Sequence, residues 1–240
     1  MKTVIVTGAD RGLGLSLCKE YLHRGWRVFA GKFMEDFTLL EDVQKDNQNL
    51  HILWLDMGCE KSITDAALKI SETAGRLDMV ISNAALMGQV KCDLYNPPMD
   101  LEAVWNSFRV NALGPLLLTE KCLPLLEKSE DKKLCYVSSE VACITLMKHR
   151  GDGAFPYPMS KAAMNMGVRM LHNELHPKGY QFRLFHPGWM KQRKADGTLS
   201  EHALFDPDHI GDIAAKYFDA ALHDEHRLVM VDYNGYEWPW

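Results

Sequence analysis

Short apolar runs alternate with longer stretches of helical period along almost the whole 240-residue chain. Continuous apolar runs of strand length are typical of strands buried on both faces, and the intervening segments repeat apolar positions every three or four residues. Strands that alternate with helices predict βαβ units and a parallel sheet. The runs predict seven strands, at Thr3–Thr7, Arg27–Ala30, His51–Asp56, Asp78–Ser82, Lys133–Ser138, Gln181–His186 and Leu228–Asp232.

The helical segments complete the same pattern. We find no composition shift, linker, repeat or low-complexity tract that would mark a second domain. We therefore expect one doubly wound α/β domain over residues 1–240, with a mostly parallel seven-stranded sheet flanked by helices. The predicted helices are Gly14–His23, Ser62–Ala74, Leu101–Asn111 continuing to Leu126, Tyr157–Leu175 and Pro207–Leu222.

Composition and charge narrow the classes of partner. The 27 basic and 32 acidic residues give a formal net charge of −5, which offers no electrostatic reason to expect nucleic acid or an anionic membrane. No apolar run approaches the roughly 18 residues that span a bilayer, and the first apolar stretch is too short for a signal peptide. The six cysteines are dispersed without a CxxC pair, so we expect reduced thiols and a cytoplasmic protein.

A glycine-rich turn follows the first predicted strand. The segment reads Thr7-Gly8-Ala9-Asp10-Arg11-Gly12-Leu13-Gly14 and leads into a helix. Glycines let the backbone approach a pyrophosphate closely, and the N–H groups and dipole of the following helix favour its negative charge. The spacing GxxxGxG predicts a dinucleotide-phosphate cradle. Asp56, followed by Met57 at the end of the third predicted strand, is a candidate acceptor for an adenine amino group.

The end of the second predicted strand bears on the choice between the two nicotinamide cofactors. An acid there binds the ribose 2′-hydroxyl, whereas a base accommodates a 2′-phosphate. Lys32 occupies this place and Arg11 lies in the glycine turn, so NADP(H) is favoured. Glu35 and Asp36 remain alternative ribose ligands if the strand is longer, and NAD(H) then becomes the cofactor.

Tyr157 and Lys161 are one helical turn apart on one face of a predicted helix. A nearby ammonium favours a phenolate and lowers the pKa of a tyrosine, which suits acid–base catalysis near neutral pH. Upstream, Ser138 and Ser139 end a predicted strand and supply hydroxyls for a substrate oxygen. The order of phosphate turn, strand-end serines and Tyr–Lys pair makes a chance combination improbable.

These motifs together resemble the short-chain dehydrogenase/reductase family over essentially the whole chain. The glycine motif matches Gly8, Gly12 and Gly14, the family's Asn-Ala-Gly segment matches Asn83-Ala84-Ala85, and the YxxxK pair is Tyr157 and Lys161. The Pro-Gly turn is Pro187-Gly188. The segment His186-Pro187-Gly188-Trp189 and the aromatic tail Asp232–Trp240 are similar to the C-factor and sniffer-type carbonyl reductase branch. A Rossmann-type fold is implied.

The resemblance implies a catalytic tetrad of Asn111, Ser139, Tyr157 and Lys161. Tyr157 would exchange a proton with the substrate oxygen, Ser139 would hydrogen-bond that oxygen, Lys161 would support the tyrosine and hold the nicotinamide ribose, and Asn111 would position a water. Whether Ser138 or Ser139 is the catalytic serine stays open, because 18 residues separate Ser139 from Tyr157 and a loop around 148–153 is inserted. Predicted cofactor contacts are Gly8, Asp10, Arg11, Gly12, Leu13, Gly14, Lys32, Asp56, Met57, Asn83, Ala84, Ala85, Tyr157, Lys161, Pro187, Gly188, Trp189 and Met190.

The function predicted from the sequence is therefore NAD(P)(H)-dependent hydride transfer to a small-molecule carbonyl, or from the corresponding secondary alcohol. The alternative is a nucleotide-binding sensor or signalling protein on the same fold without turnover. Residues 189–206 are where the resemblance places a substrate lid, and a homodimer or homotetramer is implied. We predict no metal site, because the His172–His176 pair has helical spacing but no evident third ligand.

Overall fold

The computed structural model describes residues 1–87, 100–148 and 155–240. Its described residues form one sheet in the order β3-β2-β1-β4-β5-β6-β7-β8, in which the first seven are parallel and β8 runs antiparallel to β7. The doubly wound α/β fold is confirmed. The strands are β1 (Thr3–Thr7), β2 (Arg27–Lys32), β3 (Leu50–Trp54), β4 (Met79–Ser82), β5 (Lys133–Val137), β6 (Gln181–His186), β7 (Met230–Asp232) and β8 (Glu237–Trp238).

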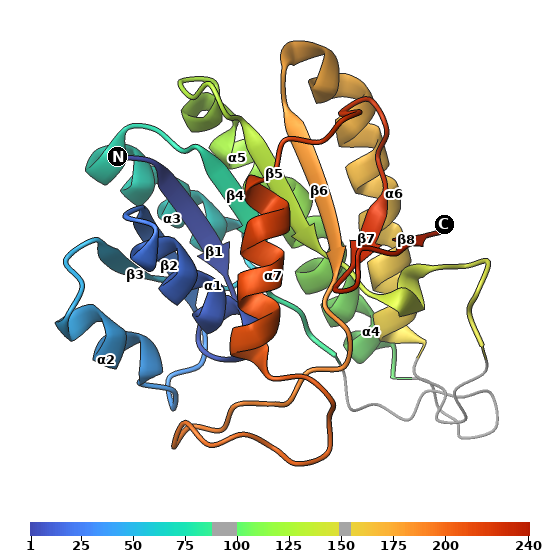
Figure 1. Cartoon of the computed structure of the whole chain (residues 1–240), viewed down its shortest axis with the longest axis horizontal. Helices are drawn as coiled ribbons and strands as arrows, with labels where there is room; N and C mark the ends of the chain where they lie inside the picture. Colours follow the sequence, from blue (N-terminus) through green and yellow to red (C-terminus); the bar gives the residue numbers. More distant parts are fainter. Residues whose placement is uncertain (88–99, 149–154) are drawn as a thin grey trace.

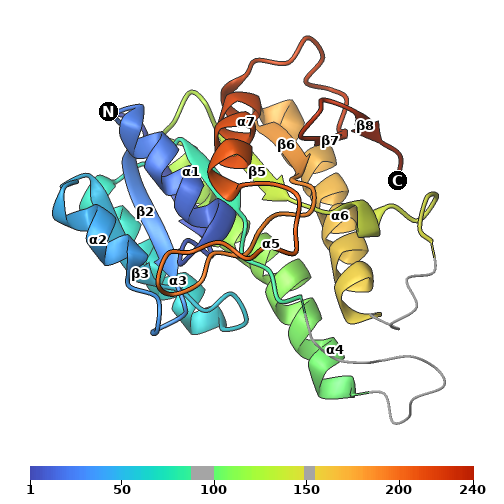
Figure 2. The same ribbon diagram turned by 60° about the horizontal axis from the view of Figure 1, so that its bottom comes forward.

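Helices cover both faces of this sheet (Figures 1 and 2). Successive side chains of β1 point to opposite faces of the sheet. Val4 and Val6 lie in a core with residues of α1 and α7, while Ile5 lies in a second core with residues of α3, α5 and α6. None of the helices in the described residues is long and apolar enough to cross a bilayer. The helices are α1 (Gly12–His23), α2 (Leu39–Lys45), α3 (Glu60–Ala74), α4 (Leu101–Phe108), α5 (Gly114–Leu126), α6 (Pro156–Leu175) and α7 (Pro207–Asp219).

Three features differ from the sequence prediction. The sheet has eight strands rather than seven, because Asp232 Oδ1 accepts hydrogen bonds from the N–H groups of Asn234 and Tyr236 and turns the chain back onto β7. The predicted helix Leu101–Leu126 is interrupted by a π-helical turn at Arg109–Leu113. The seven-residue helix α2 was not predicted, since it buries only Leu40 and so has almost no apolar periodicity.

The topology fixes where a ligand would lie. From β1 the chain builds outward through β2 to β3, then returns to place β4 on the other side of β1. Loops diverge at such a switch point, and ligands of doubly wound sheets bind in the resulting crevice beyond the carboxyl ends of the strands. Here the glycine turn follows β1 and the Asn83 segment follows β4, so both predicted cofactor motifs lie beside the crevice.

A buried ion pair anchors β6 at the far side of the sheet. Arg183 is fully buried, and its guanidinium donates to both Glu225 carboxylate oxygens at 2.7 Å and to the Ala220 carbonyl at 2.6 Å. We expect Glu225→Gln to lower the free energy of unfolding by about 3 kcal/mol, because it leaves a buried guanidinium without its counter-charge. Urea titration measures this change. Asp212→Asn, which breaks the exposed pair with Lys216, should change it by less than about 0.5 kcal/mol.

Equal losses in the two variants would contradict the role given to the Arg183–Glu225 pair.

Candidate active site

The glycine turn after β1 is shaped for close approach by a ligand. Gly8 and Gly12 have positive φ angles of 61° and 55°, which glycine adopts without strain. A Cβ on Gly14 would lie 2.1 Å from the Gly8 carbonyl oxygen, so only glycine fits there. By contrast a Cβ on Gly12 would meet nothing within 4 Å among the described residues, which leaves open space above the turn. The turn therefore has the geometry of a phosphate cradle.

Helix α1 begins at Gly12 without a cap from a side chain. The side chain of its N-cap residue Arg11 makes no capping hydrogen bond, and the first turn of α1 contains no acidic residue. The first N–H groups of a helix lack intrahelical partners and are satisfied by caps, water or ligands. A pyrophosphate is the kind of group that these free donors and the helix dipole bind. Leu13 lies in this first turn and is buried in the core.

Asn83 joins the loop after β4 to the glycine turn. Its Nδ2 donates to the carbonyl oxygens of Thr7 and Gly8 at 2.9 and 3.1 Å. Thr7 Oγ1 in turn accepts from the N–H groups of Asn83 and Ala84. A Cβ on Gly8 would lie 2.7 Å from the Cα of Ala84, so the two loops are in contact. Asn83 thus acts by holding the two sides of the crevice together, and Ala85 follows in the same segment.

Three charged residues surround the end of β2. Asp10 Oδ1 accepts from the N–H groups of Phe33 and Met34 at 2.8 and 2.6 Å, and so fixes the chain as it leaves β2. The Arg11 guanidinium lies 5.0 Å from the centre of the Phe37 ring. Lys32 ends β2 and its Nζ lies 2.6 Å from Oε1 of Glu41. Two cations therefore lie near the end of β2, and one of them, Lys32, is paired with a carboxylate.

The alternative ribose ligands Glu35 and Asp36 lie beyond the end of β2 and are exposed.

The predicted adenine contacts follow β3. Asp56 Oδ1 accepts from the Gly58 N–H at 2.8 Å, and the Asp56 N–H donates to Ser62 Oγ at the start of α3. Met57 is buried, and a Cβ on Gly114 would lie 2.3 Å from its carbonyl oxygen. The loop after β3 therefore packs against the start of α5, next to the π-helical turn. The adenine contact itself stays a prediction.

Tyr157 and Lys161 lie on the first two turns of α6. Lys161 is 1% exposed, its Nζ donates to the Val137 carbonyl at 2.8 Å, and it lies 5.9 Å from the centre of the Tyr157 ring. Burial lowers the pKa of Lys161 to about 8, because desolvation disfavours the ammonium. Tyr157 itself is half-buried. The geometry brings the phenol of Tyr157 close to the buried ammonium of Lys161, as acid–base chemistry requires.

The two strand-end serines have different surroundings. Ser138 is buried and its Oγ donates to Asn165 Oδ1 at 2.7 Å. Ser139 is half-buried and only weakly engaged, since its Oγ accepts from the Val141 N–H at 3.4 Å. A hydroxyl that must reach a substrate cannot be held in a buried hydrogen bond, so the geometry favours Ser139 as the catalytic serine. The sequence gives no sign of this difference, because Asn165 lies 27 residues away.

Asn111 lies in the π-helical turn between α4 and α5, and such turns recur at functional sites. It is fully buried, and its amide exchanges hydrogen bonds with both main-chain groups of Leu86. Its Nδ2 also donates to Ser160 Oγ at 2.9 Å, which in turn donates to the Tyr157 carbonyl. Asn111 thereby connects to the first turn of α6; the predicted link to a water stays a prediction. Ser160 is a contributor that sequence reasoning missed.

The Pro187-Gly188 turn after β6 is held against aromatic rings. Gly188 has φ 75°, and a Cβ on it would lie 2.7 Å from the Tyr233 ring. Trp189 is 63% exposed, and Met190 pairs with Phe205 across the base of the segment that follows. In Figure 1 this orange segment lies at the end of the sheet toward which the strand arrows point. It lies at the same edge as the glycine turn.

The chain's last residues support the loop that follows Ser139. The Thr145 N–H donates to the Trp240 carbonyl oxygen at 3.2 Å, and the Arg169 guanidinium of α6 lies 5.8 Å from a Trp240 ring. Trp238 packs edge-on against His186, at 5.4 Å between ring centres. Segment 237–240 therefore joins this loop to α6 and β6. The inserted loop around 148–153 lies outside the described residues apart from Lys148.

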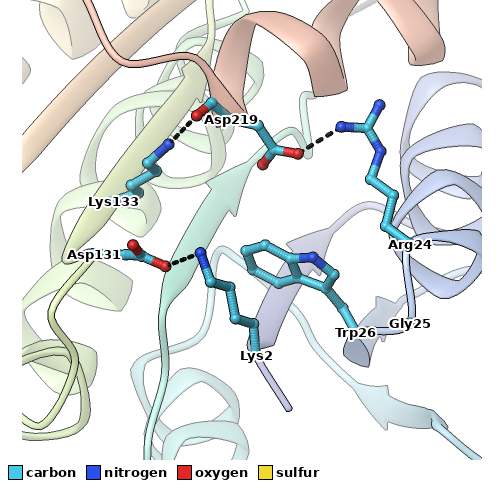
Figure 3. Close-up of a pocket in the computed structure, with 7 residues that line it drawn as sticks. All are labelled: Lys2, Arg24, Gly25, Trp26, Asp131, Lys133 and Asp219. Atoms are coloured by element: carbon cyan, nitrogen blue, oxygen red, sulfur yellow. Dashed lines mark hydrogen bonds and ion pairs between the residues drawn. The ribbon is translucent and has the colours of Figure 1, made fainter.

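Figure 3 shows a cavity of about 430 Å³ at the opposite, amino end of the sheet. Its charged groups are mutually paired: Lys2 lies 2.6 Å from Asp131, and Arg24 lies 2.5 Å from Asp219. Lys133 donates to the main-chain carbonyls of Phe218 and Asp219 at the end of α7. These contacts tie the starts of β1, β2 and β5 to α7, and leave no charged group in this cavity for chemistry.

The histidine pair of α6 also has a structural setting. The rings of His172 and His176 stack 5.0 Å apart, and His176 Nε2 lies 2.9 Å from His226 Nδ1. Within the described residues, no three His, Cys, Asp or Glu side chains are arranged to hold a metal ion.

Comparison with known proteins gives consistent matches. The family model described as short chain dehydrogenase matches residues 2–202. The C-signal protein of Myxococcus xanthus is 34% identical over 168 residues, covering 69% of this chain and 94% of its own. The crystal structure of NADPH-bound carbonyl reductase from chicken fatty liver has a TM-score of 0.85 at 25% identity, covering 100% of this chain and 99% of the other. Carbonyl reductase Sniffer of D. melanogaster shares the fold, with a TM-score of 0.84 at 23% identity over the full length of both chains.

Proposed function

Because the chain belongs to the short-chain dehydrogenase/reductase family of NAD(P)-dependent oxidoreductases, we propose that it reduces a small carbonyl compound with NADPH as the preferred cofactor. The observation that carries this proposal is the pairing of half-buried Tyr157 with the buried Lys161 ammonium. The glycine cradle at the β1–β4 switch point supports nucleotide binding, since it leaves room and free N–H donors for a pyrophosphate.

The protein's own residues supply orientation and proton transfer. When bound, the nicotinamide supplies the hydride. The Tyr157 hydroxyl passes its proton to the carbonyl oxygen of the substrate, and Ser139 donates a hydrogen bond to the same oxygen. The Lys161 ammonium stabilises the negative charge that remains on the tyrosine oxygen. Asn111 and Ser160 hold the first turn of α6, and with it Tyr157, in position. In the reverse direction the same groups oxidise a secondary alcohol.

The surroundings of the site favour an apolar substrate. Large apolar side chains are exposed on the segments that follow Ser139, precede Tyr157 and follow Pro187-Gly188. Apolar surface on a monomer is commonly a binding surface when it is concentrated at one place. Residues 189–206 are proposed as the lid over this substrate. The exposed residues are Ile144, Leu146, Met147, Phe155, Trp189 and Leu204.

Titration of the purified protein with NADPH and NADH tests the proposal without a guess about the substrate. We expect NADPH to bind more tightly, because Arg11 lies near the end of β2, where a 2′-phosphate is expected, and has no acidic partner among the described residues. A panel of aromatic and aliphatic carbonyl compounds then follows with the better nucleotide. Failure of both nucleotides to bind would refute the proposal, and binding without turnover over the whole panel would favour a signalling role.

We propose that the working form is a homodimer. Apolar side chains of α5 and α6 line a groove of about 520 Å³, and both Met166 and Met170 on α6 are largely exposed beside it. A self-complementary face of paired helices fits a twofold interface. The groove residues are Leu113, Leu116, Leu117, Glu120, Leu123, Leu171, Glu174 and Leu175.

The double substitution Met166→Glu with Met170→Glu is expected to give a monomer in sedimentation experiments, because it places charges at a buried apolar contact. Leu68→Glu changes an equally exposed apolar residue on α3 and should leave the dimer intact. A wild-type monomer at micromolar concentration would contradict the interface.

We also propose that the protein works in the cytoplasm. Its five cysteines in the described residues are free thiols, which suits a reducing compartment. Cys92, the sixth, lies outside those residues.

A further inference from the structure

An ion pair at the end of β2 bears on the choice of cofactor. The Lys32 side chain is only 12% exposed, and its Nζ lies 2.6 Å from Oε1 of Glu41 in the first turn of α2. Because the ammonium is largely shielded from water, this pair is screened less than one between two exposed side chains. The positive charge that would attract a 2′-phosphate is therefore already neutralised by a carboxylate of the same chain.

The second oxygen of Glu41 has an unusual environment. The side chain is 41% exposed as a whole, yet Oε2 is covered and accepts no hydrogen bond from the described residues. A covered carboxylate oxygen without a donor is costly. An atom that water does not reach is not open to a ribose hydroxyl either, so Glu41 acts on a bound nucleotide through the charge of its carboxylate. That charge offsets the attraction of Lys32 for a 2′-phosphate and leaves a ribose hydroxyl unaffected, so Glu41 weakens the selection for NADP(H) over NAD(H).

The position of this pair relative to the cradle is fixed by main-chain contacts. The Ala9 N–H of the glycine turn donates to the Gly31 carbonyl at 2.9 Å, and Asp10 holds the two residues after Lys32. Arg11 packs on the Phe37 ring and has no acidic partner among the described residues, so its charge stays free for a phosphate. Arg11 thus favours NADP(H), while the neutralised Lys32 adds little to that preference.

We infer that Glu41 is a specificity-determining residue that narrows the preference for NADPH and lets the site also accept NADH. It does so by neutralising Lys32. This inference rests on the proposed function, because it assumes that a nicotinamide nucleotide occupies the cradle. Sequence reasoning missed Glu41, since the contact exists only when α2 forms and folds back toward the end of β2.

The test is the dissociation constant of NADPH and of NADH, measured by calorimetry for three proteins. Relative to wild type, Glu41→Gln should bind NADPH about tenfold more tightly, because Lys32 is no longer neutralised, and should bind NADH within about twofold of wild type. Asp42→Asn removes the same formal charge from α2, but Asp42 pairs with exposed Lys45. It should leave both constants within about twofold of wild type. Equal effects of the two variants would overturn the inference.

The double variant Lys32→Met with Glu41→Gln shows whether Glu41 acts through Lys32. In the Lys32→Met background, Glu41→Gln should lose most of its gain in NADPH affinity, because the chain no longer has the Lys32 cation that Glu41 would neutralise. A full tenfold gain there would overturn the neutralisation step. If neither nucleotide binds wild type, the proposed function fails with the inference. If both bind but Glu41→Gln leaves their ratio unchanged, only the inference fails.

Discussion

Replacing Tyr157 with phenylalanine is expected to lower kcat for carbonyl reduction by about a thousandfold or more. The substitution removes only the hydroxyl, which is the group that exchanges a proton with the substrate oxygen. The ring and the hydrogen bond from Ser160 to the Tyr157 carbonyl stay in place, so the fold of the first turn of α6 should be kept. The dissociation constant of NADPH should therefore change by less than about threefold, since phosphate and adenine contacts lie elsewhere.

Steady-state kinetics with the best substrate of the carbonyl panel, together with NADPH titration, measure both effects. Tyr217→Phe is the matched control, because it also removes one phenol oxygen, on α7, that has no hydrogen-bond partner within the described residues. It should leave kcat unchanged. Turnover retained by Tyr157→Phe would remove the tyrosine from the mechanism, whereas loss of both turnover and NADPH binding would point to a structural role.

The fold was largely predictable because its signal is repeated in every strand. Residues such as Val4, Ile5 and Val6 are apolar without alternation, which only a sheet covered on both faces explains. What the sequence missed is small and local. Strand β8 has two residues and depends on the Asp232 turn, and α2 buries only Leu40. Neither contributes enough apolar surface to leave a pattern.

The candidate site was predictable where its chemistry depends on local spacing. Gly8, Gly12 and Gly14 are constrained by one turn, and Tyr157 and Lys161 by one helix. Contacts between distant segments could not be read in this way. Ser138 differs from Ser139 only through Asn165, and Lys32 is neutralised only through Glu41. The residue types were visible, but the pairings that decide their charge and accessibility arise from the tertiary fold.

Replacing Lys161 with methionine is expected to abolish turnover and, at pH 7, to make the protein more stable. Burial lowers the pKa of Lys161 from 10.5 to about 8, so the ammonium is less favourable in the folded chain than in the unfolded one. The difference of 10.5 − 8 = 2.5 units corresponds to about 3 kcal/mol. Losing the hydrogen bond to the Val137 carbonyl reduces this gain in stability by about 1 kcal/mol. A net gain of about 2 kcal/mol in the free energy of unfolding remains.

The pH dependence separates this explanation from better packing. Below pH 8 the lysine is charged in both states, and the full cost is present in wild type. Between about pH 8 and 10.5 the unfolded state keeps the proton that the folded state has lost, so wild-type stability rises with pH relative to the variant. Above pH 10.5 the advantage of Lys161→Met should be gone.

Urea titrations of both proteins at pH 7, 9 and 10.5 measure this convergence. The exposed substitution Lys69→Met is the control, and its difference from wild type should stay small across the range. A constant difference for Lys161→Met at all three pH values would show that desolvation of the ammonium is not its source. The buried Lys161 ammonium lowers the stability of the protein, and one substitution relieves that cost. A site for proton transfer requires this cost, because a charge held out of water acts more strongly on the neighbouring Tyr157.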